Sequence, residues 1–222
     1  MPTKELIKVV EFIRQRKLED PYFYARPKEY HASKLNPSHC LNAKWRGFMK
    51  AMEKGRHPDL PLKARLRMQI GELIHREVEE AFKDEYRAEV VAKIQVLDFF
   101  IVCRTDLLGK DDLIEIKTWD RKDKPLPDKP EIDHLYQVNT YCYAFRRKVG
   151  RIWYINYNTC EDVWFEHRAN PKMYRDVIAY TTLLDWFITN RQEPSHKEGC
   201  RCRKKETDNN LKKERGEEDE NN

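Results

Sequence analysis

The sequence predicts a mixed α/β domain with one central β-sheet flanked by helices, and three observations lead to this fold class. The 222 residues are 40% hydrophobic, which is enough for one substantial core without disulfide or metal staples. Some segments carry apolar residues with the 3.6-residue period of a helix, and others are short runs rich in β-branched and aromatic residues. These segments alternate along the chain as helices, strands, a helix, strands and a helix.

The first part of the chain is expected to be mainly helical. Residues 3–17 form an amphipathic pattern in which Glu5 and Glu11 interrupt the apolar positions, unlike a secretory signal. Asn36-Pro37-Ser38 is a helix-start signal. The expected helices lie at 3–17, 38–53 and 65–82, joined by an irregular segment at 18–39 and a loop at 54–61.

Strands dominate the second part of the chain. Two or three strands are expected between residues 87 and 118, and RIWYINYN and DVWFEHR predict a further hairpin. A periodic helix at about 131–147 separates these groups, and a last helix is expected to run from Asn170-Pro171 to about residue 189.

The most informative segment, LDFFIVCRTDLLGKDDLIEIKTW, carries three charged residues beside two apolar runs. The first run ends in Asp106, a polar turn follows at 109–112, and the second run contains Glu115 and Lys117. Side chains alternate along a strand, so Glu115 and Lys117 share one face, and a β-hairpin would bring Asp106 to them. Two carboxylates can bind a divalent cation, and an ammonium can position a water and offset the charge of a phosphate. This arrangement suggests phosphodiester cleavage.

The alternative is a solvated hairpin, because 36% of the residues are charged and short motifs match by chance. These charges, however, lie beside the most apolar strand pair of the chain, where surface charge is not expected. Their placement favours the functional interpretation.

Two helices contribute polar pairs at helical spacing. Gly71 and His75 lie one turn apart, and a glycine costs about 1 kcal/mol in a helix interior compared with alanine, which indicates close approach of another backbone or of a substrate. Gln137 and Tyr141 also lie one turn apart, where an amide and a phenol could hold a phosphate, a base edge or a lysine. Taken alone, His75 fits a satisfied boundary histidine, and the second pair fits a solvated helix face.

Four motifs occur in this order: Gly71-x3-His75, Asp106, Glu115-x-Lys117 and Gln137-x3-Tyr141. Together they resemble the RecB-type branch of the PD-(D/E)XK nuclease superfamily. The SKLNPSHC segment at 33–40 resembles the start of the CRISPR-associated exonucleases (the Cas-four family) and of AddB-type nuclease domains. The resemblance covers about residues 33–202 and implies a restriction-endonuclease-like core, in a chain that also fits a viral or mobile-element nuclease.

The resemblance implies a role for each motif residue. The cation, Mn2+ or Mg2+, would be bound by His75, Asp106, Glu115 and the backbone carbonyl of Ile116. Lys117 would orient the attacking water, while Gln137 and Tyr141 would position Lys117 and the DNA strand. A histidine nitrogen among the ligands shifts the preference toward Mn2+.

The expected domain organisation is a single nuclease domain at 1–202 and a charged disordered tail at 203–222. The domain would comprise a helical N-terminal part at 1–64, a catalytic core at 65–190 and a cysteine-containing segment at 191–202.

Relatives in this branch often hold an iron–sulfur cluster on four cysteines, one upstream of the core and three near the C-terminus. Cys40 matches the upstream position, whereas the C-terminal region offers only Cys200 and Cys202. The fourth ligand could be Cys160, or a histidine (His196 or His39) could replace a thiolate.

Thiolate sites bind Zn2+ as readily as iron, and the remaining alternatives are a clusterless site and structural free thiols. Cys103 and Cys142 lie in apolar periodic segments and are expected in the core.

The expected function is that of a Mg2+- or Mn2+-dependent DNA nuclease, a single-strand-preferring exonuclease or endonuclease in recombination, repair, replication or CRISPR adaptation. The alternatives are a catalytically inactive nucleic-acid-binding protein with the same fold, and RNA as the substrate. No P-loop occurs, which excludes a fused helicase and leaves a helicase or an adaptation protein as a partner in trans. No stretch has the roughly 20 apolar residues that span a bilayer, so no membrane partner is expected. The expected location is the cytoplasm, or the host cytoplasm for a viral protein.

Overall fold

The structure, a computed structural model, describes residues 28–54, 62–119, 125–196 and 200. The helix expected at 3–17 and the tail expected at 203–222 lie outside these residues. The elements in chain order are β1 (Glu29–His31), a 3-10 turn (Ala32–Lys34), α2 (Leu41–Lys54), α3 (Leu62–Ala81), β2 (Arg87–Val96), β3 (Phe99–Leu108), β4 (Asp112–Trp119), α4 (Ile132–Ala144), β5 (Val149–Asn156), β6 (Glu161–Arg168) and α5 (Pro171–Thr189).

The six strands form one mixed sheet, as predicted. The path is β1-β3-β4-β5-β6, with β2 paired to β3. The β1–β3 and β4–β5 pairs are parallel, and the β2–β3, β3–β4 and β5–β6 pairs are antiparallel. Because β2 pairs with β3 along its length, β1 and β4 share the other edge of β3. β1 occupies the start of that edge at 100–102, and β4 occupies its end at 107–108.

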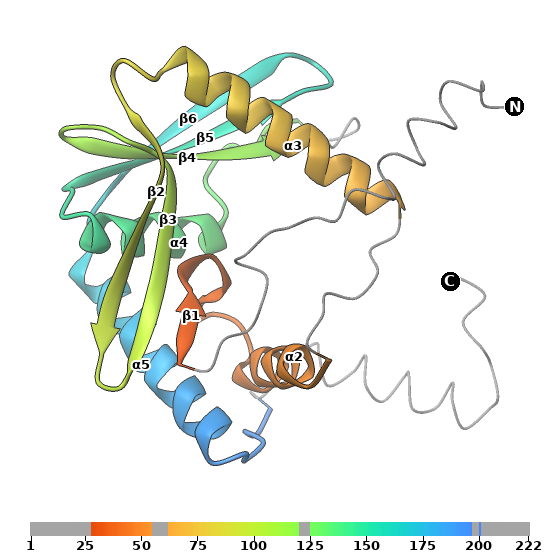
Figure 1. The fold of residues 1–222 in the computed structure, drawn as a ribbon, viewed down its shortest axis with the longest axis vertical. Coiled ribbons are helices and arrows are strands. Elements are labelled where there is room, and N and C mark those ends of the chain that lie inside the picture. The colour runs from red at the N-terminus through yellow and green to blue at the C-terminus, as the bar shows by residue number, and fades with distance from the viewer. Residues whose placement is uncertain (1–27, 55–61, 120–124, 197–199, 201–222) are drawn as a thin grey trace, which may run out of the picture.

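Helices cover both faces of the sheet, with α3 on one side and α4 and α5 on the other (Figure 1). The main core lies between the sheet and α4, and α5 adds Val177 and Leu184 to it. On the other face Leu107, Ile114 and Ile116 form a smaller core with Val78 of α3 and with Phe82, which directly follows that helix. The alternation of β4, with Ile114 and Ile116 opposite Glu115 and Lys117, is therefore as predicted.

The close packing of α4 on β5 depends on one glycine. A Cβ on Gly150 would lie 2.4 Å from Val138 Cγ1 and 3.0 Å from Cys142 Sγ. Both neighbours belong to α4, so the helix sits directly on the backbone of β5. This close approach fixes the position of α4, which also carries Gln137 and Tyr141.

The start of α5 was correctly predicted, whereas the start of α2 was not. The Asn170 side chain accepts from Lys172 N at 2.9 Å and from Met173 N at 3.3 Å, and Pro171 occupies the first turn. Asn36 instead accepts from Ser38 N at 2.8 Å, which makes a local turn, and α2 begins only at Leu41.

The segment 18–39 was expected to be irregular, and this was wrong for residues 29–31. They form β1 because Tyr30, a 3%-exposed core residue, pairs beside Ile101 of β3. A three-residue strand is too short to show a period in the sequence.

Polar contacts join the N-terminal and C-terminal ends of the described chain. Asp185 of α5 accepts from Tyr30 Oη at 2.7 Å and from Lys28 Nζ at 2.8 Å. Asn42 of α2 donates to the Pro194 carbonyl at 2.6 Å. None of the helices in the described ranges is both long and apolar enough to cross a bilayer.

Candidate active site

The candidate site lies where β3 and β4 separate. Their register holds only at Leu107–Ile114 and Leu108–Leu113. Beyond that point the Asp106 carboxylate bridges the gap, because its Oδ2 accepts from the Ile116 backbone N at 2.6 Å. The Asp106 carboxylate therefore lies in the space between the two diverging strands. It is nevertheless almost shielded from solvent, since Asp106 is only 6% exposed.

Glu115, Lys117, Gln137 and Tyr141 form one hydrogen-bonded network. Lys117 Nζ donates to Glu115 Oε1 at 2.6 Å and to Gln137 Oε1 at 3.0 Å. Gln137 Nε2 donates to Glu115 Oε1 at 2.6 Å and lies 2.8 Å from Tyr141 Oη. The structure thus brings together all four residues singled out on β4 and α4. The Lys117 side chain is 21% exposed, so solvent reaches part of it while two acceptors hold its ammonium.

The α3 helix brings His75 to the same place. His75 Nδ1 lies 3.4 Å from Asp106 Oδ1. One turn earlier, a Cβ on Gly71 would lie 3.2 Å from Thr118 Oγ1 of β4, which is tighter than most real contacts. The glycine thus permits a close approach of α3 to β4, although the neighbour is a side chain and not the backbone or substrate expected from the sequence. This approach sets the height of His75 over the sheet.

Burial and mutual repulsion give the two carboxylates different ionisation. Burial, and then the charge of Asp106, raises the pKa of Glu115 to about 7. Burial also opposes ionisation of Asp106, but the hydrogen bond and charge of His75 outweigh it and lower the pKa of Asp106. Burial disfavours the His75 cation, yet Asp106 raises the pKa of His75 overall.

One oxygen of Glu115 has the character of a cation ligand. Glu115 is 4% exposed, and its Oε2 is buried without a hydrogen-bond partner among the described residues, whereas Oε1 accepts from both Lys117 and Gln137. A buried carboxylate oxygen that no donor satisfies is costly unless a cation meets it. The donor set of carboxylates and one imidazole fits Mn2+ or Mg2+.

Sequence reasoning missed Glu89 of β2. Ligand atoms of His75, Glu89 and Asp106 all lie within 4.8 Å of one another. The short turn between β2 and β3 could have revealed Glu89 in the sequence. Val96 pairs with Phe99 across this turn, and counting back along both strands from that pair places Glu89 opposite Asp106. The β2–β3 hairpin was not itself recognised in the sequence, so this register was not followed.

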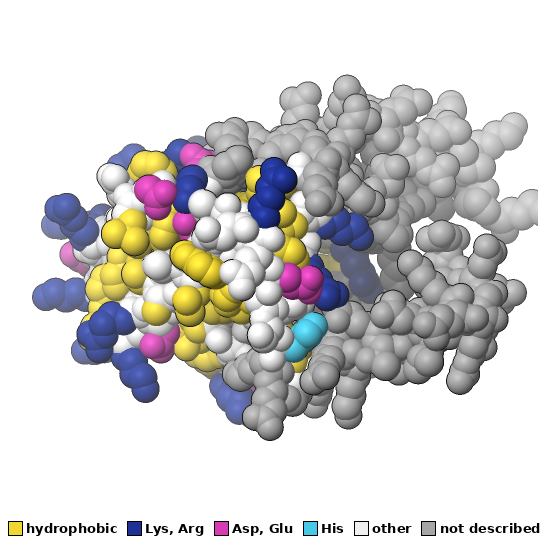
Figure 2. All heavy atoms as spheres, turned by 90° about the horizontal axis from the view of Figure 1, so that it is seen from below, with side chains coloured by type: hydrophobic (Ala, Val, Ile, Leu, Met, Phe, Trp, Pro, Cys, Tyr) yellow, Lys and Arg dark blue, Asp and Glu magenta, His cyan; other side chains and the backbone are white. Residues whose placement is uncertain are grey.

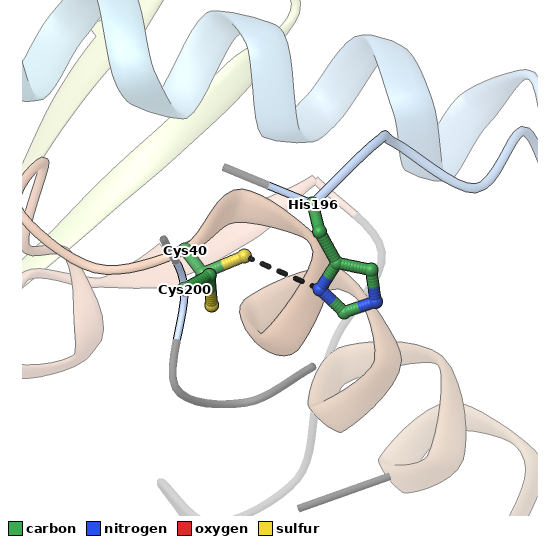
Figure 3. A group of neighbouring side chains, drawn as sticks. All are labelled: Cys40, His196 and Cys200. Carbon is green, nitrogen blue, oxygen red and sulfur yellow. Dashed lines mark hydrogen bonds between the residues drawn. The ribbon is translucent and has the colours of Figure 1, made fainter. Parts of the chain in front are cut away.

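A second group of ligand types lies far from the hairpin. Atoms of Cys40, His196 and Cys200 lie within 4.8 Å of one another, with Cys40 Sγ 3.8 Å from His196 Nδ1 (Figure 3). Cys40 precedes α2, and the other two residues follow α5. Cys200 is disulfide-bonded, so it would have to be reduced to bind a metal as a thiolate.

The predictions for the other cysteines have different outcomes. Cys103 and Cys142 are buried in the main core, as expected. Cys160 is exposed in the turn between β5 and β6 and is not in the Cys40 group. Cys202 lies outside the described residues. His39, the other histidine considered, lies 3.2 Å from Asp133 instead.

Residues 146–151 include four basic residues, Arg146, Arg147, Lys148 and Arg151, and two of them serve the fold. Arg147 donates to the Gly109 carbonyl at 3.1 Å, and Arg151 lies 2.7 Å from Asp112. On the face shown in Figure 2, Lys and Arg side chains lie mostly toward the margins of a surface with many hydrophobic side chains. That face carries no continuous basic patch among the residues described.

The sequence matches no family model and no curated protein. The structure is similar to the crystal structure of an alkaline exonuclease (LHK-Exo) from Laribacter hongkongensis, with a TM-score of 0.53, 15% identity, and 77% of this chain and 95% of that chain covered. The same exonuclease in complex with dAMP matches with a TM-score of 0.51, 14% identity and the same coverage. A protein named SSO0001 is 22% identical over 80% of this chain and 84% of its own, but its TM-score of 0.48 is too low to assign a fold. The chain therefore has the restriction-endonuclease-like fold that the sequence predicted.

Proposed function

We propose that the protein is a metal-dependent DNA nuclease that hydrolyses phosphodiester bonds. One observation carries this proposal above the others: a lysine and two carboxylates converge where β3 and β4 separate, and one buried carboxylate oxygen there has no hydrogen-bond partner within the described part of the chain. A protein that only bound nucleic acid would gain nothing from a buried, unsatisfied carboxylate beside a held ammonium.

The metal would be held by Asp106 and Glu115, with His75 as a nitrogen ligand and the Ile116 carbonyl as a further oxygen. A bound Mn2+ or Mg2+ supplies Lewis acidity at a phosphate oxygen and lowers the pKa of water. In the metal-free protein the hydrogen bond and charge of His75 outweigh burial and lower the pKa of Asp106, so Asp106 is already ionised when an ion binds. His75 would release its proton on coordinating the ion. The imidazole ligand favours Mn2+ over Mg2+ relative to an all-oxygen site.

Lys117 orients the attacking water and offsets the charge that develops on the phosphate. Its ammonium is fixed by Glu115 Oε1 and Gln137 Oε1, which occupy two of its three N–H donors and leave the third for the substrate or the water. Gln137 is in turn held by Tyr141, so α4 positions the lysine without touching the ion. Preorganised charge of this kind needs no rearrangement when the reaction occurs.

The test is a time course on end-labelled single-stranded DNA, duplex DNA and a matched RNA, with Mg2+, Mn2+ or EDTA. We expect DNA cleavage with Mn2+ and Mg2+, none with EDTA, and none by Asp106→Asn. Terminal mononucleotides would identify an exonuclease, and internal fragments an endonuclease. Cleavage of RNA but not of DNA would show that the substrate is RNA. Cleavage that does not need a metal, or no cleavage at all, would refute the proposal.

The Cys40, His196 and Cys200 group is proposed as a structural metal site, for Zn2+ or an iron–sulfur cluster, with Cys202 as the candidate fourth ligand. It would link the segment before α2 to the segment after α5, so its loss should affect stability more than chemistry. Purification under reducing conditions, followed by elemental analysis and visible absorbance, distinguishes zinc from iron. Metal content that survives Cys40→Ser would refute the site.

The biological setting proposed from the resemblance is a cytoplasmic nuclease of the Cas-four or AddB-like branch, of cellular or viral origin. A helicase or an adaptation protein would act with it in trans. The fold and the site geometry are compatible with this placement, and copurification from the native source tests it.

A further inference from the structure

A third residue beside His75 and Asp106 has the geometry of a metal ligand. Ligand atoms of His75, Glu89 and Asp106 lie within 4.8 Å of one another. The Glu115 carboxylate is not part of this group. Metal–oxygen bonds of roughly 2.0–2.6 Å let one ion span ligand atoms about 4–5 Å apart. The three atoms are therefore close enough to contact a single ion.

The backbone at Glu89 departs from the strand that contains it. Its φ is 51°, and among the described non-glycine residues with positive φ it is the only one inside a strand. The β2–β3 register runs from Ala88–Leu107 directly to Val90–Thr105, so the departure occurs opposite Asp106. A left-handed residue in a strand redirects its side chain and costs about 1–3 kcal/mol, which a purely structural surface glutamate would not require.

One observation beside this cluster points to a cation, and another shows what a cation would displace at Glu89. The buried Oε2 of Glu115, on β4, has no hydrogen-bond partner among the residues described, and Asp106 lies close enough to Glu115 to influence its ionisation. Glu89 Oε2 lies 3.1 Å from Arg104 Nε, and both side chains are about two-fifths exposed. A guanidinium already neutralises Glu89 in part, in a position that solvent can reach.

We propose that Glu89 is a ligand of the catalytic cation, sharing it with His75 and Asp106 and exchanging Arg104 for the ion when the metal binds. This inference rests on the proposed nuclease site and adds a carboxylate from β2, which none of the recognised motifs includes. Asp106 then lies between two groups of proposed ligands: His75 of α3 and Glu89 of β2 on one side, and Glu115 of β4 on the other.

The test measures Mn2+ binding without DNA, by the electron paramagnetic resonance signal of free Mn2+ during titration. Removing a direct ligand should weaken binding at least about tenfold, since loss of even an outer partner costs 10–100-fold. We expect Glu89→Gln to reach this loss. Glu79→Gln is the matched control, because Glu79 lies near the same groups but outside the ligand cluster, and it should change the affinity less than about threefold because solvent screens its charge.

Arg104→Gln should act in the opposite direction and tighten Mn2+ binding, because Glu89 no longer has to exchange partners. Should Glu89→Gln fail to fold, Glu89→Asn repeats the test with a residue that tolerates positive φ. Equal losses for Glu89→Gln and Glu79→Gln would overturn the proposal, since they would reflect charge and not coordination. Unchanged binding in Arg104→Gln would overturn the exchange.

These outcomes separate the inference from the proposed function. If Glu89→Gln cleaves DNA and binds Mn2+ with wild-type affinity, the proposal that Glu89 is a ligand is refuted and the proposed nuclease function stands. If Mn2+ binding depends on Glu89 but the protein cleaves neither DNA nor RNA, the proposed nuclease function is refuted and the metal site stands.

Discussion

The buried Glu115 carboxylate should make the metal-free protein less stable as the pH rises. The perturbation is Glu115→Gln, which removes the titrating group and keeps a side chain of the same size. The Gln oxygen still accepts from Lys117 and Gln137, where Glu115 Oε1 accepts now. The difference between wild type and variant therefore isolates the ionisation of Glu115.

The sign follows from the direction of the pKa shift. Burial and Asp106 raise the pKa of Glu115 from 4.5 to about 7 in the folded protein. Between these values the folded protein keeps a proton that the unfolded chain has released, so the free energy of unfolding falls as the pH rises. At 1.36 kcal/mol per pKa unit, the whole fall is about 3 kcal/mol. It is complete above the folded pKa and absent below pH 4.5.

The assay is urea unfolding in EDTA, followed by circular dichroism, at intervals from pH 4.5 to 8.5. Asp106 titrates below this window, because its pKa is lowered. His75, whose pKa is raised, loses its stabilising proton in the upper part of the window and contributes to the fall in both proteins. We expect wild type to lose about 3 kcal/mol more than Glu115→Gln. Parallel curves for the two proteins would refute the assignment of Glu115 as a strained buried carboxylate.

Saturating Mn2+ should reverse this difference. The ion stabilises the ionised carboxylate, so wild type should gain stability from the metal as the pH rises, and Glu115→Gln should gain less. A wild-type pH profile that Mn2+ leaves unchanged would contradict a cation at Glu115.

Three further predictions concern the framework of the site. Gly150→Ala should lower the free energy of unfolding by about 1–3 kcal/mol, because the new Cβ meets Val138 at 2.4 Å; Gly47→Ala, with nothing within 4 Å, is the control and should be neutral or stabilising in urea melts. Asp185→Ala should cost about 1–3 kcal/mol in the same measurement, because it leaves the buried Tyr30 hydroxyl without its acceptor, whereas Lys28 keeps Asp98 and Thr189. Gln137→Ala should slow single-turnover cleavage by about 10–100-fold while the protein stays folded, because Lys117 loses one of its two anchors; a wild-type rate would show that α4 does not position the lysine.

The long periodic elements could be predicted because each carries its own signal. The α3 repeat and the α5 cap at Asn170-Pro171 specify local structure, and the structure contains both. β1 could not be predicted, since three residues form a strand only because β3 offers an unpaired edge beside them. Its stability comes from a partner that lies about 70 residues away in the sequence.

The candidate site shows the same division. Glu115 and Lys117 share a face because strand side chains alternate, and their contact with Gln137 follows once α4 packs on β4. The position of Glu89 opposite Asp106 follows from the short β2–β3 turn, which was not recognised in the sequence, whereas its positive φ is visible only in the structure. The Cys40 and His196 contact joins residues at opposite ends of the described chain, and no local pattern predicts such a contact.

The most direct test of the proposed nuclease is the cleavage rate of Lys117→Ala on end-labelled single-stranded DNA with Mn2+. Lys110→Ala, an exposed lysine in the turn of the same hairpin, is the matched control. We predict that Lys117→Ala loses at least about 100-fold in rate, as expected when preorganised charge stabilisation is removed, while DNA binding in EDTA and the circular dichroism spectrum stay those of wild type. Lys110→Ala should cleave normally. Cleavage by Lys117→Ala at the wild-type rate would contradict the account.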